Sequence, residues 1–353
     1  MAIAIVGHLV ERSDKNTMTT STPIPKLSSF TLPWPTNWTE IFGTERPLIL
    51  EIGFGYGQYL EHLHKTRPDA NIIGIEINNT CLVKAERAIP RKKMHNVRVV
   101  HSTAETALHH LFPPHSLSEI HINFPDPWFK ERHAGRRLMQ RDTLDAIVSR
   151  LQVGGMLYLA TDIRAYADMS AGLLGATPGL TNTLDAPWIP EMPGRTITKY
   201  EKKAIAVDRP RHYFAYQRNQ HPIPDVPLIM ELPMPHIVFY SPLSLDELFT
   251  GITASDISDH TFEFGETRIN FKNVYKGDQS LLFDIYAHEP TIDQRVSLAL
   301  VMREDYPSEF TLKLGAIGNP RPTTGMHHAV RTLGERLLAL HPETKVLQDK
   351  VKS

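Results

Sequence analysis

The sequence predicts an α/β protein with a mostly parallel, doubly wound, Rossmann-like sheet, followed by a smaller α+β domain with an antiparallel sheet and one long helix. Two observations carry this prediction. Between residues 47 and 174, short apolar runs alternate with amphipathic stretches, which is typical of a parallel sheet covered by helices on both faces. Beyond residue 236, apolar and polar residues alternate with period two, which is typical of a half-exposed antiparallel sheet.

In the first domain, each apolar run is expected to be a strand and each amphipathic stretch a helix. The expected strands are 47–54, 71–77, 97–102, 117–124 and 155–162, and the expected helices are 57–66, 79–89, 104–112, 141–151 and 165–174. Sheets of this kind bind ligands beyond the carboxyl ends of their strands. The unusual residues of the sequence lie at those ends, so we expect the functional site there.

A proline-rich stretch, QHPIPDVPLIMELPMP, separates the two patterns, and prolines this dense block helix and sheet interiors. We therefore expect a disordered tail (1–25), a first domain (26–219), a linker (220–235) and a C-terminal domain of unknown role (236–353). In the last domain, one strand face holds Phe310, Leu312 and Leu314 and the other Thr311 and Lys313; the final helix has an apolar stripe of Val330, Leu333, Leu337 and Leu338.

The composition narrows the class of protein. The 353 residues include one cysteine, Cys81, which excludes an internal disulfide and a cysteine-rich metal site and fits a reducing, cytoplasmic environment. No apolar run approaches the ~20 residues of a membrane span, and the N-terminus does not resemble a signal peptide. The adjacent histidine pairs lack a ligand-type partner four residues away, so no metal is expected.

Charge is distributed unevenly. Residues 1–222 contain 26 Lys and Arg against 21 Asp and Glu, a net of +5, whereas residues 223–353 contain 12 against 18, a net of −6. The densest basic stretch, KERHAGRRLMQR at 130–141, holds five basic residues and one acid. Such a patch fits a polyanionic partner or an ordinary solvated surface.

The first strand-to-helix turn, LEIGFGYG, places Gly53, Gly55 and Gly57 where a ligand can approach the backbone closely. Glu51 precedes this turn, and Glu76 ends the second strand, where a carboxylate can accept both ribose hydroxyls of an adenosine. The dinucleotide pattern G-x-G-x-x-G fails at Gln58. Because Glu51 would repel a pyrophosphate but suit an ammonium group, the turn favours S-adenosyl-L-methionine over a nicotinamide cofactor.

The fourth strand ends in NFPDPWFK, in which two prolines clamp Asp126 by fixing the backbone on either side of it. Asp126 is expected beside the sulfonium of the methyl donor. Trp128 and Phe129 offer stacking surfaces for a base, and Lys130 and the following arginines can meet phosphates. A proline turn with its aromatic residues packed in the core is the structural alternative.

With the segments LEIGFGYG, GIEI, FPDPWFKERHAGRR, LATD and TKYE, residues 30–218 resemble the bacterial tRNA (guanine-N7-)-methyltransferase family, and so a class I methyltransferase fold. The resemblance implies a site with Asp126 as the catalytic acid. It implies that the donor is bound by Glu51, Gly53, Gly55, Gly57, Glu76, Thr103, Ala104 and Asp126. It implies that guanosine or tRNA is bound by Lys130, Arg136, Asp162, Thr198, Lys199, Tyr200 and Glu201. Thr103 stands where many members of the family carry an acid that faces the adenine amine.

The implied reaction is methyl transfer to N7 of guanine at position 46 of the tRNA variable loop. That atom carries a lone pair and no proton, so the reaction needs alignment rather than a general base, and a carboxylate can stabilise the positive charge that develops. We assign this role to Asp126 and base recognition to Asp162. The alternatives are a methyltransferase for another RNA base or a small molecule, and an inactive RNA-binding module; a monomer and a homodimer are equally compatible with the sequence.

Overall fold

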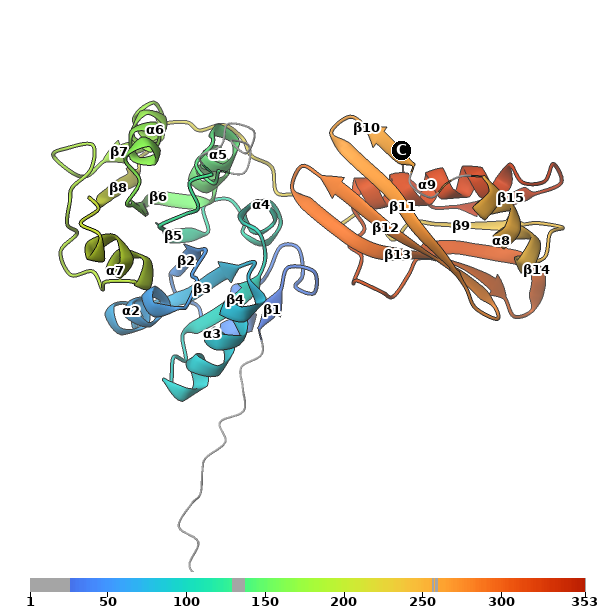
Figure 1. Ribbon diagram of the computed structural model, residues 1–353, viewed down its shortest axis with the longest axis horizontal. Coiled ribbons are helices and arrows are strands. Elements are labelled where there is room, and N and C mark those ends of the chain that lie inside the picture. The colour runs from blue at the N-terminus through green and yellow to red at the C-terminus, as the bar shows by residue number, and fades with distance from the viewer. Residues whose placement is uncertain (1–25, 129–136, 256, 258–259, 353) are drawn as a thin grey trace, which may run out of the picture.

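The computed structural model describes residues 26–128, 137–255, 257 and 260–352, and its chain forms two sheets (Figure 1). Sheet A, in the first domain, has the strand order β1-β4-β3-β2-β5-β6-β8-β7. Its strands are β1 (Leu27–Ser28), β2 (Leu48–Ile52), β3 (Asn71–Glu76), β4 (Val97–His101), β5 (Leu117–Asn123), β6 (Leu151–Thr161), β7 (Leu180–Asn182) and β8 (His212–Arg218). All neighbouring strands are parallel except at β8, which runs antiparallel to β6 and β7. The predicted mostly parallel, doubly wound sheet is confirmed.

Helices cover both faces of sheet A. They are α1 (Trp38–Phe42), α2 (Gln58–Thr66), α3 (Asn79–Arg91), α4 (Ala104–Thr106) with the π-helical turn η1 (Ala107–Leu111), α5 (Arg141–Arg150), α6 (Arg164–Gly175) and α7 (Lys199–Ala206). Apolar residues of α2 and α3 pack with Ile49, Ile72 and Val97 on one face. Residues of α4, η1, α5 and α6 pack with Leu50 and Ile73 on the other. The alternating apolar runs of the sequence are therefore strands buried on both sides.

Sheet B forms the core of the C-terminal domain and is antiparallel, with the order β10-β11-β12-β13-β14-β9-β15. Its elements are β9 (His236–Tyr240), α8 (Leu245–Ala254), β10 (Thr261–Phe264), β11 (Thr267–Lys276), β12 (Ser280–Glu289), β13 (Ile292–Arg303), β14 (Tyr306–Leu314), α9 (Thr324–Leu338) and β15 (Lys345–Asp349). Phe310 and Leu312 are fully buried, and so are Val330, Leu333 and Leu337 on α9. One face of the sheet thus packs under the helices, as the two-residue alternation predicts.

Residues 220–235 contain no helix or strand but are hydrogen-bonded on both sides. Arg150, which is fully buried in the first domain, donates from Nη1 to the Val226 carbonyl (3.0 Å). At the other end, the Leu232 amide donates to the Pro322 carbonyl of the C-terminal domain (2.8 Å). The connection is therefore held against both domains along its length. Among the described residues, no helix is both long and apolar enough to cross a membrane.

Candidate active site

The glycine turn after β2 requires glycine at three positions. Gly53, Gly55 and Gly57 have φ angles of 70°, 55° and 73°, a left-handed region that side chains disfavour. The turn delivers the chain into α2, whose N-cap is Gly57. The backbone at Gly53 and Gly55 therefore lies open to a ligand at the carboxyl edge of the sheet.

A cavity of about 350 Å³ lies at this edge. Its lining comes from the ends of four neighbouring strands, β2, β3, β4 and β5, and includes Gly53, Gly55, Glu76, Thr103, Ala104 and Asp126, with Asn123, Trp128 and Leu138. Six of the eight donor-site residues predicted from the sequence thus line one cavity. Of the other two, Glu51 lines a smaller adjoining cavity that shares Gly53, Gly55 and Asn123, and Gly57 caps α2.

Backbone N–H groups hold the Glu76 carboxylate in place at the end of β3. Oε2 accepts from the Gly55 amide (3.0 Å), and Oε1 accepts from the amides of Ile77 and Asn78 (both 2.9 Å). A carboxylate oxygen accepts up to about two hydrogen bonds, so Oε2 retains capacity for a further donor. The geometry suits recognition of a hydroxyl group.

The carboxylate of Glu51 is buried, and only one of its two oxygen atoms accepts a hydrogen bond. Its Oε1 accepts from Asn123 Nδ2 (2.9 Å), whereas Oε2 has no hydrogen-bond partner. Burial raises its pKa to about 7, although the hydrogen bond from Asn123 and the charge of Arg195 oppose the rise. An unpartnered, buried carboxylate oxygen lacks a counter-charge, and a ligand ammonium group would supply one.

Asn123 and Arg195 were not predicted from the sequence, yet they connect the two sides of the site. Arg195 donates from Nη2 to Asn123 Oδ1 (2.7 Å), and its guanidinium stacks over the rings of Tyr59 (4.4 Å) and Tyr213 (5.4 Å). The amide of Asn123 therefore bridges Glu51 and Arg195. A polar residue ending the apolar strand β5 was the available signal for Asn123; Arg195 lies in a loop whose local sequence carries none.

The Pro-Asp-Pro segment is bracketed by two strained residues. Phe124 and Trp128 have φ angles of 53° and 42°, which cost about 1–3 kcal/mol each outside glycine. The Phe124 amide donates to the Ala160 carbonyl (2.8 Å), and the Trp128 carbonyl accepts from Arg137. With Asp126 exposed on the cavity wall between these fixed ends, the loop presents one carboxylate in one place.

Thr103 caps the short helix α4. Its Oγ1 accepts from the Thr106 amide (3.1 Å) and donates to Thr106 Oγ1 (3.0 Å). Thr103 therefore lines the cavity with a hydroxyl whose proton is engaged elsewhere.

The predicted substrate residues fall in several places. Asp162, just after β6, forms an ion pair with Arg209 (Oδ2 to Nη1, 2.6 Å) and is not among the residues that line the donor cavity. Thr198 and Glu201 form the capping box of α7, the helix that also contains Tyr200. Glu201 is buried and accepts from the Tyr213 hydroxyl. The predictions for Lys130 and Arg136 lie outside the described residues.

Lys199 begins α7 beside the glycine turn. Its amide donates to Gln58 Oε1 (2.6 Å), and its Nζ lies 3.9 Å from the centre of the Tyr56 ring. Lys84 lies over the same ring at 4.2 Å. Tyr56 is 38% exposed, so two cations and an aromatic ring share the rim of the site.

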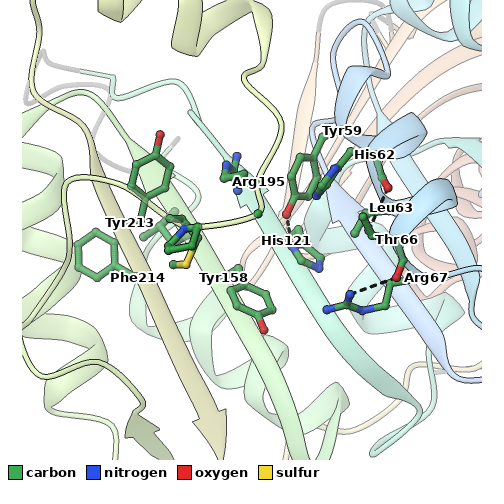
Figure 2. A pocket seen from close by; sticks show the side chains of 14 residues that line it. Tyr59, His62, Leu63, Thr66, Arg67, His121, Tyr158, Arg195, Tyr213 and Phe214 are labelled. Atoms are coloured by element: carbon green, nitrogen blue, oxygen red, sulfur yellow. Dashed lines mark hydrogen bonds between the residues drawn. The ribbon is translucent and has the colours of Figure 1, made fainter.

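A third cavity, of about 280 Å³, lies on the sheet face below Arg195 (Figure 2). The His121 ring, stacked on Tyr158, hydrogen-bonds to Glu119 through Nε2 (2.9 Å) and to the Tyr59 hydroxyl through Nδ1 (3.3 Å). Since the carboxylate only accepts, Nε2 carries the proton and Nδ1 accepts from Tyr59. This network fixes the Tyr59 ring under Arg195. In the described part of the chain, no cluster of three or more His, Cys, Asp or Glu could hold a metal ion.

A family model described as "Putative methyltransferase" matches residues 45–213. The tRNA (guanine-N(7)-)-methyltransferase of Cupriavidus metallidurans is 38% identical over 175 residues, which cover 49% of this chain and 67% of that protein. The chain belongs to the tRNA (guanine-N7-)-methyltransferase family. The same-named protein of Paraburkholderia xenovorans is 36% identical over 173 residues, covering 49% of this chain and 66% of that protein. The chain thus spans about two thirds of the length of these relatives.

Among solved structures, the 16S rRNA methyltransferase KamB superimposes with a TM-score of 0.42 at 13% identity, over 55% of this chain and 99% of that one. The match to the family model ends at residue 213, before sheet B begins. The site residues that the structure describes, from Glu51 to Glu201, all lie within the part of the chain that matches the family.

Proposed function

We propose that this chain transfers a methyl group from S-adenosyl-L-methionine to N7 of a guanine in tRNA, at position 46 of the variable loop, in the cytoplasm. The observation that carries the proposal is the single cavity joining the glycine turn, Glu76, Thr103 and Asp126, with the unpartnered Glu51 oxygen beside it. The names of the relatives support the choice of tRNA and of guanine N7.

The residues of the cavity fit this donor from end to end. Glu51 supplies a buried negative charge for the ammonium group, and Gly53 and Gly55 give room at the backbone. Glu76 accepts from the ribose hydroxyls, and Thr103 and Ala104, at the end of the next strand, face the adenine. Bound there, S-adenosyl-L-methionine supplies an electrophilic methyl group on a sulfonium.

The acceptor requires placement rather than deprotonation, because N7 of guanine already carries a lone pair. Asp126 is held by the strained 124–128 loop on the wall of the donor cavity. Its carboxylate stabilises the positive charge that the purine gains as the methyl group is transferred. Since the loop is fixed before the reaction, little reorganisation is needed at that moment.

On the acceptor side, we assign different roles to the residues of α7 and its neighbours. Lys199 lies on the rim with Tyr56 and meets the RNA backbone. Thr198 and Glu201 keep the start of α7 in place, since their groups bond to each other. Asp162, oriented by Arg209, accepts from the N1–H and exocyclic amine of guanine, donors that adenine does not offer together. Lys130 and Arg136 add phosphate contacts.

The test is to incubate the purified full chain with unmodified tRNA transcript and isotope-labelled donor, digest the RNA and identify the product by mass spectrometry. We expect 7-methylguanosine, mapped to position 46 by chemical cleavage at the modified base. Asp126→Ala should abolish its formation while the melting temperature stays unchanged, because Asp126 is exposed.

The matched control is Asp278→Ala, at an exposed position in the turn before β12. This variant should methylate tRNA at the wild-type rate. A different methylated base, or no product from the wild-type protein, would overturn the proposed function. A wild-type rate in Asp126→Ala would overturn only the role of Asp126.

A further inference from the structure

The C-terminal domain contacts the wall of the donor cavity through one tight turn. Pro290 and Thr291 join β12 to β13, and the turn packs against α4 and η1 of the first domain. Thr106 on α4 donates from Oγ1 to the Thr291 carbonyl (2.8 Å). This contact joins residues 185 positions apart and lies one side chain away from the donor cavity.

The direction of this hydrogen-bond chain is fixed. A carbonyl oxygen can only accept, so the Thr106 hydroxyl must donate to Thr291. Thr106 Oγ1 therefore accepts from Thr103. The single proton of the Thr103 hydroxyl is used in this hydrogen bond. Thr103 Oγ1 also accepts from the Thr106 amide. One lone pair of Thr103 Oγ1 remains, and Thr103 lines the donor cavity.

The position of Thr103 determines which part of the donor it meets. Along the cavity edge, the glycine turn follows β2, Glu76 ends β3 and Thr103 follows β4, in the order in which these strands lie in the sheet. A donor with its amino-acid end at Glu51 and its ribose at Glu76 has its adenine at Thr103. The exocyclic amine of adenine is a donor and requires an acceptor there.

We propose that the β12–β13 turn of the C-terminal domain is a positioning element of the donor site. Through Thr106, it orients the Thr103 hydroxyl as a hydrogen-bond acceptor for the exocyclic amine of adenine. This inference rests on the proposed function, since it takes the donor to be an adenosyl compound. It gives the C-terminal domain a role in donor recognition. It also explains how the neutral Thr103 can accept a hydrogen bond from the adenine amine at a position where many members of the family carry an acid.

The turn is anchored firmly enough for this role. Burial lowers the pKa of His110 to about 4, so its ring is neutral at pH 7. Its Nδ1 donates to the Ile229 carbonyl (3.1 Å), which leaves Nε2 to accept from the Thr291 hydroxyl (3.0 Å). The next residue, Ile292, is buried in the apolar core of the first domain.

Stacking beside the turn fixes the same interface. The His110 ring stacks on Trp34 with ring centres 3.8 Å apart, and the guanidinium of Arg321 lies 4.4 Å over the Trp34 ring. Arg321, from the C-terminal domain, also donates to the carbonyls of Phe30 (3.1 Å) and Leu32 (2.8 Å). The Thr291 carbonyl is therefore held in one position relative to α4.

The test measures binding of S-adenosylhomocysteine and S-inosylhomocysteine to the full chain by calorimetry. The second ligand carries a carbonyl in place of the exocyclic amine, so the wild-type protein should prefer the first. Thr106→Val frees the Thr103 hydroxyl to rotate and to donate. We expect about a 3- to 10-fold loss of affinity for the adenosyl ligand, the range of one net hydrogen bond, and a smaller preference over the inosyl ligand.

Three further variants separate positioning from folding. Thr106→Ser keeps the hydroxyl and should restore the wild-type preference. Thr36→Val is the matched control, because Thr36 is a buried threonine that donates to a backbone carbonyl, that of Pro33 (2.8 Å), and does not line the donor cavity. It should lower the melting temperature without changing the preference. If the Thr106→Val protein does not fold, Thr106→Ala removes the same hydroxyl group and should give the same loss of preference.

The outcomes are distinguishable. If the wild-type protein bound no S-adenosylhomocysteine, the donor site would be wrong, and this inference with it. If the wild-type protein bound it and Thr106→Val kept the same preference between the two ligands, only the role of the C-terminal turn would be overturned. A preference lost in Thr106→Val and restored in Thr106→Ser would support it.

Discussion

Replacing Glu51 with glutamine should stabilise the free protein and weaken donor binding at the same time. The Glu51 pKa is raised from 4.5 to about 7 by burial, and Oε2 has no partner. One pKa unit corresponds to 1.36 kcal/mol, so ionised Glu51 costs the folded state on the order of 3 kcal/mol. Glutamine has nearly the same shape, retains an acceptor for Asn123 and carries no charge.

The pH dependence has a definite sign. Below pH 4.5, Glu51 is protonated in both the folded and unfolded states and contributes nothing. Between pH 4.5 and 7, the folded protein holds a proton that the unfolded chain has released, so the cost grows with pH and is complete above pH 7. The stabilisation by Glu51→Gln should therefore be on the order of 3 kcal/mol at pH 8 and vanish near pH 4.5.

Donor affinity should change in the opposite sense. Because the ammonium group pairs with the carboxylate, wild-type affinity for S-adenosylhomocysteine should rise with pH up to about 7, whereas the glutamine variant should bind weakly with no such dependence. Chemical denaturation and calorimetry at pH 5.5 and 8 measure both effects, with Glu335→Gln, an exposed position on α9, as the control. Equal stability at pH 8, or retained donor affinity, would refute this account of Glu51.

Two further predictions concern α7 and the rim of the site. Replacing Lys84 and Lys199 with alanine should weaken tRNA binding and reduce the slope of log affinity against log salt by about 1 per lost phosphate contact, measured by filter binding between 50 and 200 mM salt; an unchanged slope would place both lysines outside the RNA interface. Tyr213→Phe leaves the buried Glu201 without its hydroxyl donor and should lower the free energy of unfolding by about 1–3 kcal/mol. Denaturation curves that coincide with the wild type would show that Glu201 finds another partner.

Local signals allowed much of the first domain to be predicted. Glycines with positive φ, apolar strands and the Pro-Asp-Pro clamp act within a few residues of one another, so their patterns can be recognised in the sequence. The strand β8 and its antiparallel direction were not predicted, because the direction of a strand depends on the strands beside it and not on its own residues. The pairing of Asn123 with Arg195 joins residues 72 positions apart and depends on how the loop before α7 folds back.

The C-terminal domain shows the same limit. Its alternating strands were predicted, but the short strands β9, β10 and β15, which depend on their neighbours in sheet B, were not. The ten-residue helix α8 was not predicted either, although Ser244 and Glu247 form a capping box at its start. Thr106 and Thr291 have no sequence feature that would mark them as partners. Contacts between domains are determined by surface shape, to which local propensity contributes little.

The burial of Ile292 among the apolar side chains of the first domain means that the two domains are not thermally independent. Withdrawing the β12–β13 turn would expose the Ile292 side chain together with the Trp34 ring. Partial unfolding of the C-terminal domain would therefore expose apolar side chains of the first domain to water. Damage to a strand of sheet B, far from the donor cavity, would then reduce the amount of folded protein in a cell without changing the site of the molecules that remain folded.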